Sequence, residues 1–570
     1  MVLLPEHAVM GHAMTDKQSR LSETILTGFL VFSSLGIFIY FLIQLSAYYN
    51  DDAYIVLRYA KNFLEGKGLV WNAGERVEGY SCFFWLMLIS LLGYVKINLV
   101  LASKILGVLF AFLTFVLLFI FDQQKRFIGA LLLATNSCFA LWALGGLETV
   151  PFGFFIFLGC CLFLKKKRAG VTLLSSGLVF SIAAMTRPEG ILFFSVTVLF
   201  CLFEDKRITP QNLGNALLFI IGFFVCYLPY FVWRLLYYGQ LFPCTFYVKG
   251  GSNIFKLLFG ARYTFHFLIM FAFPLLSMVF VKNWKRFFSD STYLITLLLG
   301  YFMYILVIGG DHMQGFRFYV PVLPLLYLFV QECFYAARFG RNSIPFNVLF
   351  IFIIGLNFFV SYRSILWGPE AAIDSLSHSY KYRTCLNVPE PAAYVGKVVG
   401  LYMKDHWPNN ALVAGNAAGA IPYYSEIAFL DMLGLTDYTI AKREITYDST
   451  FLIKDLLDIK KLISARGRSH IMQNISSRYL PWQLIPGHAK GDARYVLSRK
   501  PDFIIIGPCH GSLTPWFLGD REILSSPEFQ QHYRLKEVPI QIFDKFYTFY
   551  EPTKTGTLTF RYYEKKKQGS

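Results

Sequence analysis

Long apolar runs recur from the N-terminal region to residue 362, and they constrain the fold of this chain more than any other feature. The first run extends from about Glu23 to Tyr48, long enough for a helix to cross a hydrocarbon core of about 30 Å. Further runs lie at 98–121, 127–144, 150–164, 171–185, 190–203, 213–235, 262–281, 291–308, 319–337 and 345–362. Together they predict a polytopic α-helical membrane protein with about 11 transmembrane helices.

The composition favours the same class. Hydrophobic residues make up 55% of the 570 residues and charged residues 16%, with a mean hydropathy of +0.47. A soluble protein could not bury this much apolar surface in one core. The first run is too long for the hydrophobic region of a signal peptide, so we expect a retained helix. The expected location is the plasma (inner) membrane, with the lipid bilayer as a partner and no nucleic acid.

Basic residues mark alternate loops between the runs. They are Lys125–Arg126, Lys165–Arg168, Lys206–Arg207, Lys282 with Lys285–Arg286, and Arg338 with Arg341. Because Lys and Arg near helix ends tend to stay in the cytoplasm, these loops are predicted to be cytoplasmic. The other loops are then external, and they hold Asp51–Asp52, Gly145–Glu148, Thr186–Gly190, Tyr237–Lys249 and Gly309–His312. We therefore expect these polar segments to converge on one membrane face.

The predicted transmembrane domain covers residues 1–364, and its first external loop, 49–97, is the expected catalytic loop. Within this loop, 53–64 has the apolar spacing of an amphipathic helix lying along the membrane interface, and Gly66 and Gly68 end it. A second short apolar helix is expected at 83–94.

With an odd number of spans, residues 365–570 form an extracytoplasmic domain. Short apolar runs at 411–414, 427–430 and 502–507 predict buried strands of an α/β sheet. The segment Gly415–Ala420 resembles a loop that opens a helix, but it lacks the GxGxxG pattern and a Walker lysine, which argues against nucleotide binding. A disulfide between Cys385 and Cys509 is one option in this domain.

Two adjacent carboxylates, Asp51 and Asp52, follow the first apolar run directly. Such a pair is either a solvated loop end or a reactive group at the membrane surface. Adjacent carboxylates repel each other, and this repulsion should raise the proton affinity of one of them. The position favours a catalytic base over a solvated loop.

A resemblance to a known family rests on motifs that extend over most of the chain. They are Asp51–Ile55, Arg58–Ala60, Gly68–Asn72, Gly74–Tyr80, Trp85, Gly145–Glu148, Arg187–Gly190, Tyr238–Gly239, Pro243, Thr245, Tyr247, Lys249, Gly309–Asp311, Met313, Arg317–Phe318, Pro321, Pro324, Ile421–Tyr424 and Asp431–Asp437. The chain resembles polyprenyl-phosphate-sugar-dependent glycosyltransferases with the GT-C fold, and among them the terminal β-(1→2)-arabinofuranosyltransferases. It departs from their pattern at Ser81–Cys82 and Cys244, where Thr and Asn would be expected.

The resemblance implies an inverting transfer of a sugar, D-arabinofuranose, from a polyprenyl-phosphate donor to an envelope glycan on the external face. Asp51 is the first choice for the catalytic base and Asp52 the second. The residues expected to bind the donor phosphate are Arg58, Arg187, Lys249 and Arg317. The pocket is expected to include Tyr54, Glu75, Glu78, Tyr80, Glu148, Tyr247, Asp311 and His312.

Several alternatives stay open. No cofactor is expected, but a divalent cation is an option, with Asp51, Asp52, Asp311 and His312 as its ligands. A related transferase could move mannose or another sugar onto a protein or lipid acceptor. A transporter or flippase for lipid-linked sugars would also need many helices, although it would place charges at the membrane midplane.

Overall fold

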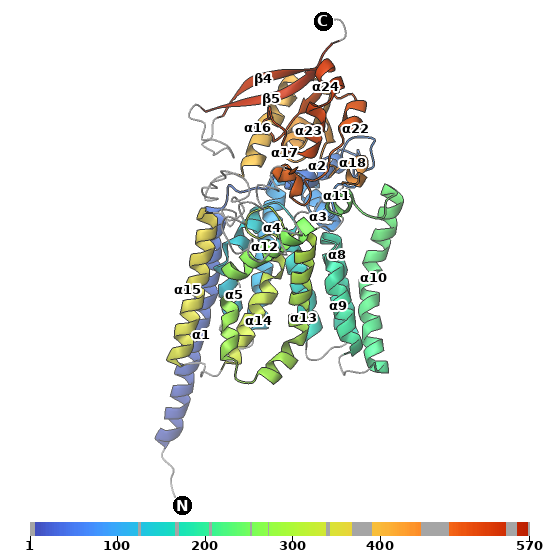
Figure 1. Ribbon diagram of the computed structural model, residues 1–570. Helices are drawn as coiled ribbons and strands as arrows, with labels where there is room; N and C mark the ends of the chain where they lie inside the picture. Colours follow the sequence, from blue (N-terminus) through green and yellow to red (C-terminus); the bar gives the residue numbers. More distant parts are fainter. Residues whose placement is uncertain are drawn as a thin grey trace, which may run out of the picture.

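The computed structural model describes residues 6–122, 127–165, 170–203, 208–250, 254–271, 273–337, 343–367, 390–445, 478–542 and 556–567. Figure 1 shows a bundle of helices and, over one end of it, an α/β domain formed by the C-terminal part of the chain. Helix α1 (Glu6–Gln44) begins at the opposite end of the bundle.

The apolar runs expected from the sequence are helical over most of their length. The further helices of the bundle and its loops are α2 (Ala53–Leu64), α3 (Phe83–Tyr94), α4 (Leu99–Phe121), α5 (Ile128–Ala134), α6 (Ser137–Leu144), α7 (Thr149–Leu164), α8 (Gly170–Thr186), α9 (Gly190–Phe203), α10 (Pro210–Tyr238), α11 (Cys244–Lys249), α12 (Ile254–Phe271), η1 (Phe273–Phe280), α13 (Trp284–Ile308), η2 (Val320–Val322), α14 (Leu323–Tyr335) and α15 (Ile344–Trp367).

Within the described residues, 6 helices are long and apolar enough to cross a membrane, or up to 7 if the bent pair α6 and α7 is one span. The chain is thus a multi-pass membrane protein, but the expected count of about 11 spans is not confirmed. One reason is the run 127–144, which is split because the side chain of Asn136 accepts hydrogen bonds from the amides of Cys138 and Phe139 and begins a new helix there. Another is the run 262–281, where α12 ends at Phe271 and η1 follows.

The first external loop contains the two helices expected from its sequence, α2 and α3. Gly66 and Gly68, both with positive φ, follow α2 as predicted. The expectation that α2 lies along the membrane interface stays a prediction, but residues 53–60 are all buried, Arg58 included, so this part of the helix has no face open to lipid or water. On its polar face, Arg58 bonds to Ile427 and Lys61 to Glu426 of the C-terminal domain.

The C-terminal domain is an α/β domain, as expected. Its elements are α16 (Pro391–His406), β1 (Leu412–Gly415), α17 (Ala420–Ser425), β2 (Ala428–Asp431), α18 (Tyr438–Lys442), η4 (Pro481–Leu484), α22 (Ala493–Ser498), β3 (Phe503–Ile505), α23 (Leu518–Leu524), α24 (Pro527–His532), β4 (Tyr533–Gln541) and β5 (Thr557–Lys565). The boundary placed at 364/365 stays a prediction; the last long helix, α15, ends at Trp367.

The sheet of this domain has the strand order β2-β1-β3-β5-β4. The predicted strands β1, β2 and β3 run parallel to one another, and β5 joins β3 in the antiparallel sense. The sequence analysis missed both β4 and β5, since neither YRLKEVPIQ nor TLTFRYYEK contains the continuous apolar run by which the other three strands were predicted. Strand β4 pairs with β5 from Tyr533↔Lys565 to Gln541↔Thr557.

The two parts of the molecule meet at Arg58 of α2. Its Nε donates to Trp71 O at 3.0 Å, its Nη2 donates to Ile427 O at 2.9 Å, and its Nη1 donates to Pro422 O. The ring of Trp71 lies 4.6 Å from the guanidinium and donates its Nε1 hydrogen to Phe429 O at 3.0 Å. One buried cation thus satisfies carbonyl groups on both sides of the junction.

We expect Arg58→Ala to destabilise the junction, because the buried carbonyls of Trp71, Pro422 and Ile427 lose this donor. Each buried carbonyl left unpaired costs about 1–3 kcal/mol. The melting temperature of the detergent-solubilised protein should fall, and proteolysis between the two parts should accelerate. Arg534→Ala is the control, since it breaks a surface pair with Glu564 that is worth less than about 1 kcal/mol. Equal melting temperatures for the two variants would contradict this role of Arg58.

Candidate functional site

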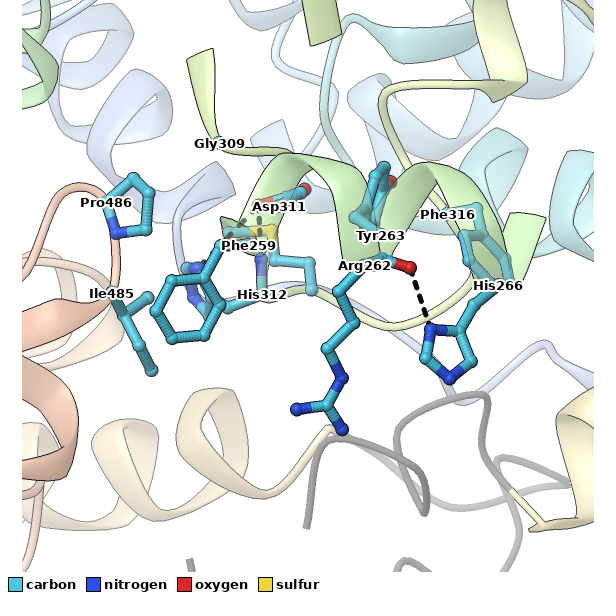
Figure 2. Close-up of a pocket in the computed structure, with 11 residues that line it drawn as sticks. Phe259, Arg262, Tyr263, His266, Gly309, Asp311, His312, Phe316, Ile485 and Pro486 are labelled. Carbon is cyan, nitrogen blue, oxygen red and sulfur yellow. Dashed lines mark hydrogen bonds and ion pairs between the residues drawn. The ribbon is translucent and has the colours of Figure 1, made fainter. Parts of the chain in front are cut away.

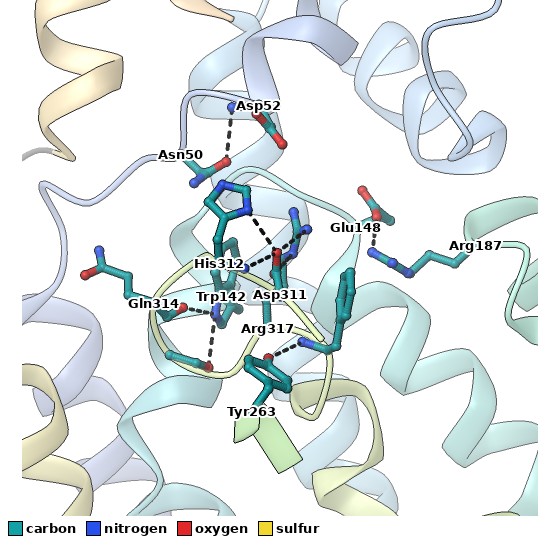
Figure 3. Close-up of polar contacts among 12 residues, drawn as sticks. Asn50, Asp52, Trp142, Glu148, Arg187, Tyr263, Asp311, His312, Gln314 and Arg317 are labelled. Atoms are coloured by element: carbon teal, nitrogen blue, oxygen red, sulfur yellow. Dashed lines mark hydrogen bonds and ion pairs between the residues drawn. The ribbon is translucent and has the colours of Figure 1, made fainter. Parts of the chain in front are cut away.

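The loops expected to be external meet beneath the C-terminal domain (Figure 3). Asn50 N, just after α1, donates to Gly145 O in the α6–α7 loop at 3.2 Å. Arg187 in the α8–α9 loop bonds to Glu148 at 2.6 Å. The predicted convergence of these polar segments is therefore confirmed. Lys285, from one of the basic loops predicted to be cytoplasmic, lies near the start of α13. The polar loop at Gly309 follows the other end of this helix, about one membrane thickness away.

Three of the predicted phosphate-binding cations surround the ring of Phe318. Arg187 Cζ lies 5.3 Å, Lys249 Nζ 6.0 Å and Arg317 Cζ 4.9 Å from the ring centroid. They come from the α8–α9 loop, the end of α11 and the segment after α13, and their approach to one ring places them around a common point. The sequence indicated these cations but gave no reason to expect that an aromatic ring would gather them.

Arg187 is held between two carboxylates. Its Nη1 bonds to Glu148 Oε1 at 2.6 Å, and its Nη2 and Nε bond to Glu189 at 2.8 and 3.2 Å. Burial alone would lower the pKa of Arg187, but Glu189 and Glu148 outweigh this effect and raise it well above its ordinary value. Arg187 is therefore permanently charged, and each of its three nitrogen groups is bonded to a glutamate.

Arg317 and Asp311 form a second buried ion pair. Arg317 Nε lies 2.7 Å from Asp311 Oδ2, and Nη2 donates to Oδ1 at 3.2 Å. His312 Nδ1 lies 3.6 Å from the same carboxylate. Burial would raise the pKa of Asp311, but Arg317 and then His312 lower it below its ordinary value. In the described part of the chain, Arg317 contacts Asp311 through Nε and Nη2, and its Nη1 group takes no part in this ion pair.

Lys249, at the end of α11, has no recorded hydrogen bond or ion pair to its Nζ within the described residues. The residue is exposed to solvent. Desolvation by the surrounding protein, and then Arg317, lower the pKa of Lys249, whereas Asp311 and Asp52 act in the opposite direction. Lys249 is thus the cation of this cluster that stays available to an incoming anion.

The two adjacent aspartates face different parts of the molecule. Both are half-buried, and Figure 3 shows Asp52 above His312 and Asp311. Asp51, the first choice for the base, instead accepts a hydrogen bond at 2.9 Å from the amide of Ala420 in the C-terminal domain. The structure therefore brings Asp52, and not Asp51, to the cation cluster.

Arg58 and several predicted pocket residues lie elsewhere. Arg58 is taken up by the junction described above. Glu78 pairs with Arg234 of α10 at 2.8 Å, and Glu75 pairs with the half-exposed Arg499 at 2.9 Å. These carboxylates connect segments of the fold and do not line the cluster.

The predicted tyrosines also have structural contacts. Tyr80 shares a hydrogen bond of 3.0 Å with Tyr238, and Tyr54 shares one of 3.3 Å with Tyr424. Tyr247 packs near Tyr438 and under the ammonium of Lys442, 5.1 Å from its ring. The polar residues that the structure does bring together are Asp52, Glu148, Arg187, Lys249, Asp311, His312 and Arg317.

Sequence reasoning missed the aromatic residues that frame the cluster. Trp142 of α6 lies 5.7 Å from Arg317 Cζ and donates to the carbonyls of Gln314 and Gly315 at 3.2 Å each. His488, from the C-terminal domain, packs edge-on to His312 with 4.6 Å between ring centroids. Trp142 sits inside an apolar run and His488 far along the chain, so no local pattern marks either residue.

A cleft adjoins Asp311 and His312 on the side of α12 (Figure 2). It encloses about 590 Å³, part of which is open to solvent, and its walls are mainly apolar. The lining residues are Phe259, Arg262, Tyr263, His266, Gly309, Asp311, His312, Met313, Phe316, Ile485 and Pro486. The cleft thus joins an apolar space to the polar cluster.

The residues suggested for a divalent cation do not form a ligand set. Asp51 turns toward Ala420, and Asp311 is engaged by Arg317. Among the residues that the structure describes, no group of three or more His, Cys, Asp and Glu side chains is arranged to hold a metal ion.

The suggested disulfide cannot be followed, because Cys385 lies outside the described residues. The partner named for it, Cys509, is buried, and its Sγ donates to Ala392 O at 3.5 Å.

Comparisons with known proteins match parts of the chain. The family model described as "Domain of unknown function (DUF8728)" matches residues 387–550. The chain is 37% identical over 83 residues to the terminal beta-(1->2)-arabinofuranosyltransferase of Corynebacterium glutamicum, a match that covers 15% of this chain and only 12% of that protein. This relative bears the name of the family that the motifs resemble.

Solved structures give likenesses at low identity. ArnT from Cupriavidus metallidurans in the apo state has a TM-score of 0.47 and 11% identity, covering 76% of this chain and 91% of its own. The same protein bound to undecaprenyl phosphate gives 0.43 and 11%, covering 71% and 85%. The Archaeoglobus fulgidus oligosaccharyltransferase complex with Zn and sulfate gives 0.40 and 12%, covering 70% and 62%. Scores this low say nothing about the chemistry of the site.

Asp51 should make the stability of the protein depend on pH. Burial, with a contribution from Asp52, raises the pKa of Asp51 from 3.8 to about 7. The folded protein therefore keeps a proton that the unfolded chain loses between these values, and the stabilisation from this group falls as the pH rises through the window. Asp51→Asn carries no such proton. Its melting temperature should exceed that of the wild type by a margin that grows from about pH 4 to about pH 7 and then stays level.

The exposed carboxylate Asp290 provides the matched control for this titration. Asp290→Asn should shift the melting temperature by a similar small amount at every pH. Two other buried titratable groups remain in both variants. They are Glu390, whose pKa is raised to about 8 by burial and then by Asp51, and the thiol of Cys509. A difference between Asp51→Asn and wild type that stays flat from pH 5 to 8 would refute the raised pKa.

Proposed function

We propose that this protein is a membrane glycosyltransferase that transfers a sugar from a polyprenyl-phosphate donor to a hydroxyl group of a cell-envelope acceptor. The observation that carries the proposal is the gathering of Lys249 and Arg317 around the ring of Phe318, next to the Asp311–His312 pair above which Asp52 lies (Figure 3). We infer that Asp52 is the base of the reaction and that these two cations bind the donor phosphate.

The proposed chemistry divides between these two sides. Asp52 accepts the proton of the acceptor hydroxyl as its oxygen attacks the anomeric carbon, and the bond from this carbon to the phosphate oxygen breaks. Lys249 and the Nη1 group of Arg317 stabilise the negative charge on the departing lipid phosphate. One displacement at the anomeric carbon inverts its configuration, and no covalent enzyme intermediate forms.

Lys249 and Arg317 are preferred over Arg187 and Arg58 as phosphate ligands. All three nitrogen groups of Arg187 bond to Glu148 and Glu189. The donors of Arg58 are taken by the junction. A phosphate oxygen would have to displace these contacts, whereas Lys249 has none recorded in the described part of the chain.

The location of the site suits a lipid-linked donor. It lies at the end of the helix bundle, where Asp311 and His312 also line the mainly apolar cleft. An isoprenoid chain belongs in the bilayer and its phosphate at the polar boundary. The distribution of basic loops favours the extracytoplasmic face, with the C-terminal domain on the same side.

The proposed sugar is D-arabinofuranose and the proposed acceptor an envelope glycan. Support comes from the motifs between Asp51 and Tyr80 and from the 83-residue match at 37% identity to an arabinofuranosyltransferase. A panel of radiolabelled polyprenyl-phosphate arabinofuranose, mannose and aminosugar donors tests it. Turnover of another donor would overturn the sugar, and turnover of none by folded protein would favour a transporter.

The role of Asp52 can be tested by Asp52→Asn, which removes the base but keeps the size of the side chain. Transfer, measured as release of free polyprenyl phosphate, should fall about 10²–10⁴-fold in kcat. Asp290→Asn, at an exposed position of α13, should transfer at the wild-type rate. Wild-type turnover by folded Asp52→Asn would exclude Asp52 as the base.

The role of Lys249 can be tested by Lys249→Ala. Because this cation is proposed to stabilise the leaving phosphate, kcat/KM for the donor should fall about 10²–10³-fold. Lys442→Ala is the matched control, since this exposed lysine bonds to Gln240 at 2.7 Å and lies outside the cluster. If both variants lose activity equally, the loss does not report on the phosphate.

A further inference from the structure

Asp51 contacts the backbone of the C-terminal domain very closely. Its Oδ1 accepts the amide hydrogen of Ala420, the first residue of α17, at 2.9 Å. At the preceding residue, Gly419, an added Cβ would overlap both the carboxylate and the carbonyl oxygen of Asp51. Only glycine can occupy position 419 in this arrangement, so the fit between the two chain segments is specific.

The turn that carries both aspartates is also fixed from the membrane side. Asn50 N donates to Gly145 O at 3.2 Å, and Asn50 Oδ1 accepts the amide of Asp52 at 3.1 Å. The amide of Ala53 donates to Asn50 O at 3.2 Å. Asp52 is thus attached to a turn that the helical part holds at Asn50 and the C-terminal domain holds at Asp51.

The surroundings of Asp51 leave its Oδ1 no room to act on a substrate. A Cβ added at Gly396 in α16 would lie 3.4 Å from this oxygen, so α16 approaches it closely. Glu390, the N-cap of α16, faces the same region and accepts the amide of Ala393 at 2.8 Å. A general base must reach the hydroxyl that it deprotonates, and Asp51 is directed into the domain junction instead.

We propose that Asp51 is a positioning residue that ties the turn to Gly419 and Ala420 and thereby aims Asp52 at the cation cluster. This inference rests on the proposed function. Side chains of adjacent residues in such a turn leave the backbone in different directions, so holding one of them sets the direction of the other. Docking of the C-terminal domain therefore becomes a condition for a correctly placed base.

An asparagine separates positioning from proton transfer at residue 51. Its side-chain oxygen can accept the Ala420 amide as the carboxylate does, but it cannot act as a base. Asp51→Asn should therefore keep transfer within about threefold of the wild type, whereas Asp51→Ala loses the acceptor. For Asp51→Ala we expect kcat to fall about 10–100-fold, the effect of a misplaced reactive group, with the donor KM within about twofold.

The partner side of the contact gives an independent variant. Gly419→Ala changes no reactive group, but its Cβ displaces Asp51, so it should reproduce the loss of kcat seen in Asp51→Ala. The matched control is Asp437→Ala, which removes an N-cap that bonds to the amides of Thr439 and Ile440 in the same domain. This control should keep the wild-type kcat.

Hydrogen exchange at the Ala420 amide reports on the contact without any turnover. Its protection should persist in Asp51→Asn and Asp52→Asn and be lost in Asp51→Ala. Unchanged protection in Asp51→Ala would overturn the inference. This readout needs no turnover, so it remains decisive even if the wild type turns over no donor. The absence of turnover would refute the proposed function instead.

Two kinetic outcomes would also overturn the inference. If folded Asp51→Asn is as inactive as Asp52→Asn, Asp51 takes part in proton transfer. If Asp51→Ala and Gly419→Ala both keep the wild-type kcat, the contact does not aim Asp52. An active Asp52→Asn would instead refute the assignment of the base, which separates the failure of the proposed function from that of the positioning role.

Discussion

The buried guanidinium of Arg58 is the interaction on which the arrangement of this molecule depends. It lies in α2 of the helical part, yet it donates to Pro422 O and Ile427 O in the C-terminal domain. Carbonyl groups buried without a donor are costly, so the domain can dock in this way only with a cation beneath it. Docking then covers α2, brings Gly419 against Asp51 and places His488 beside His312. The same docking therefore covers the candidate site at Asp51 and His312 and leaves Lys249 exposed.

Charge pairing within the cluster explains how so many ionised groups can lie together near a bilayer. Burying an unpaired charge is far more costly than burying a paired one. Arg187 has two glutamate partners and Arg317 has Asp311, so both guanidinium groups are balanced before any substrate arrives. Lys249 lies where water reaches it and needs no such partner. In such a site, Lys249 is the cation that can bind an anionic ligand without first breaking an ion pair.

Much of the architecture could be predicted because it depends on local patterns. The helices 53–64 and 83–94 and the three parallel strands follow from apolar spacing and turn residues, and the alternation of basic loops predicted that the polar loops would meet. The number of spans could not be derived in the same way. Hydrophobicity measures whether a segment tolerates lipid, but Asn136 divides one such segment through two hydrogen bonds to nearby amides. An apolar run is therefore not always a continuous helix.

The sequence by itself determined that this chain is a membrane protein, where its polar loops lie, and which residue types they bring to one face. Those properties follow from the cost of burying polar groups in hydrocarbon, which each segment carries with it. Only the tertiary structure decided that Arg58 and Glu78 stabilise the fold and that Lys249 can bind an anion. It also decided that Asp51 contacts the C-terminal domain while Asp52 lies near the cation cluster. The physical reason is that these roles depend on partners far along the chain, such as Ala420 for Asp51 and Arg234 for Glu78. Local sequence patterns do not reveal which distant residues will form a hydrogen bond.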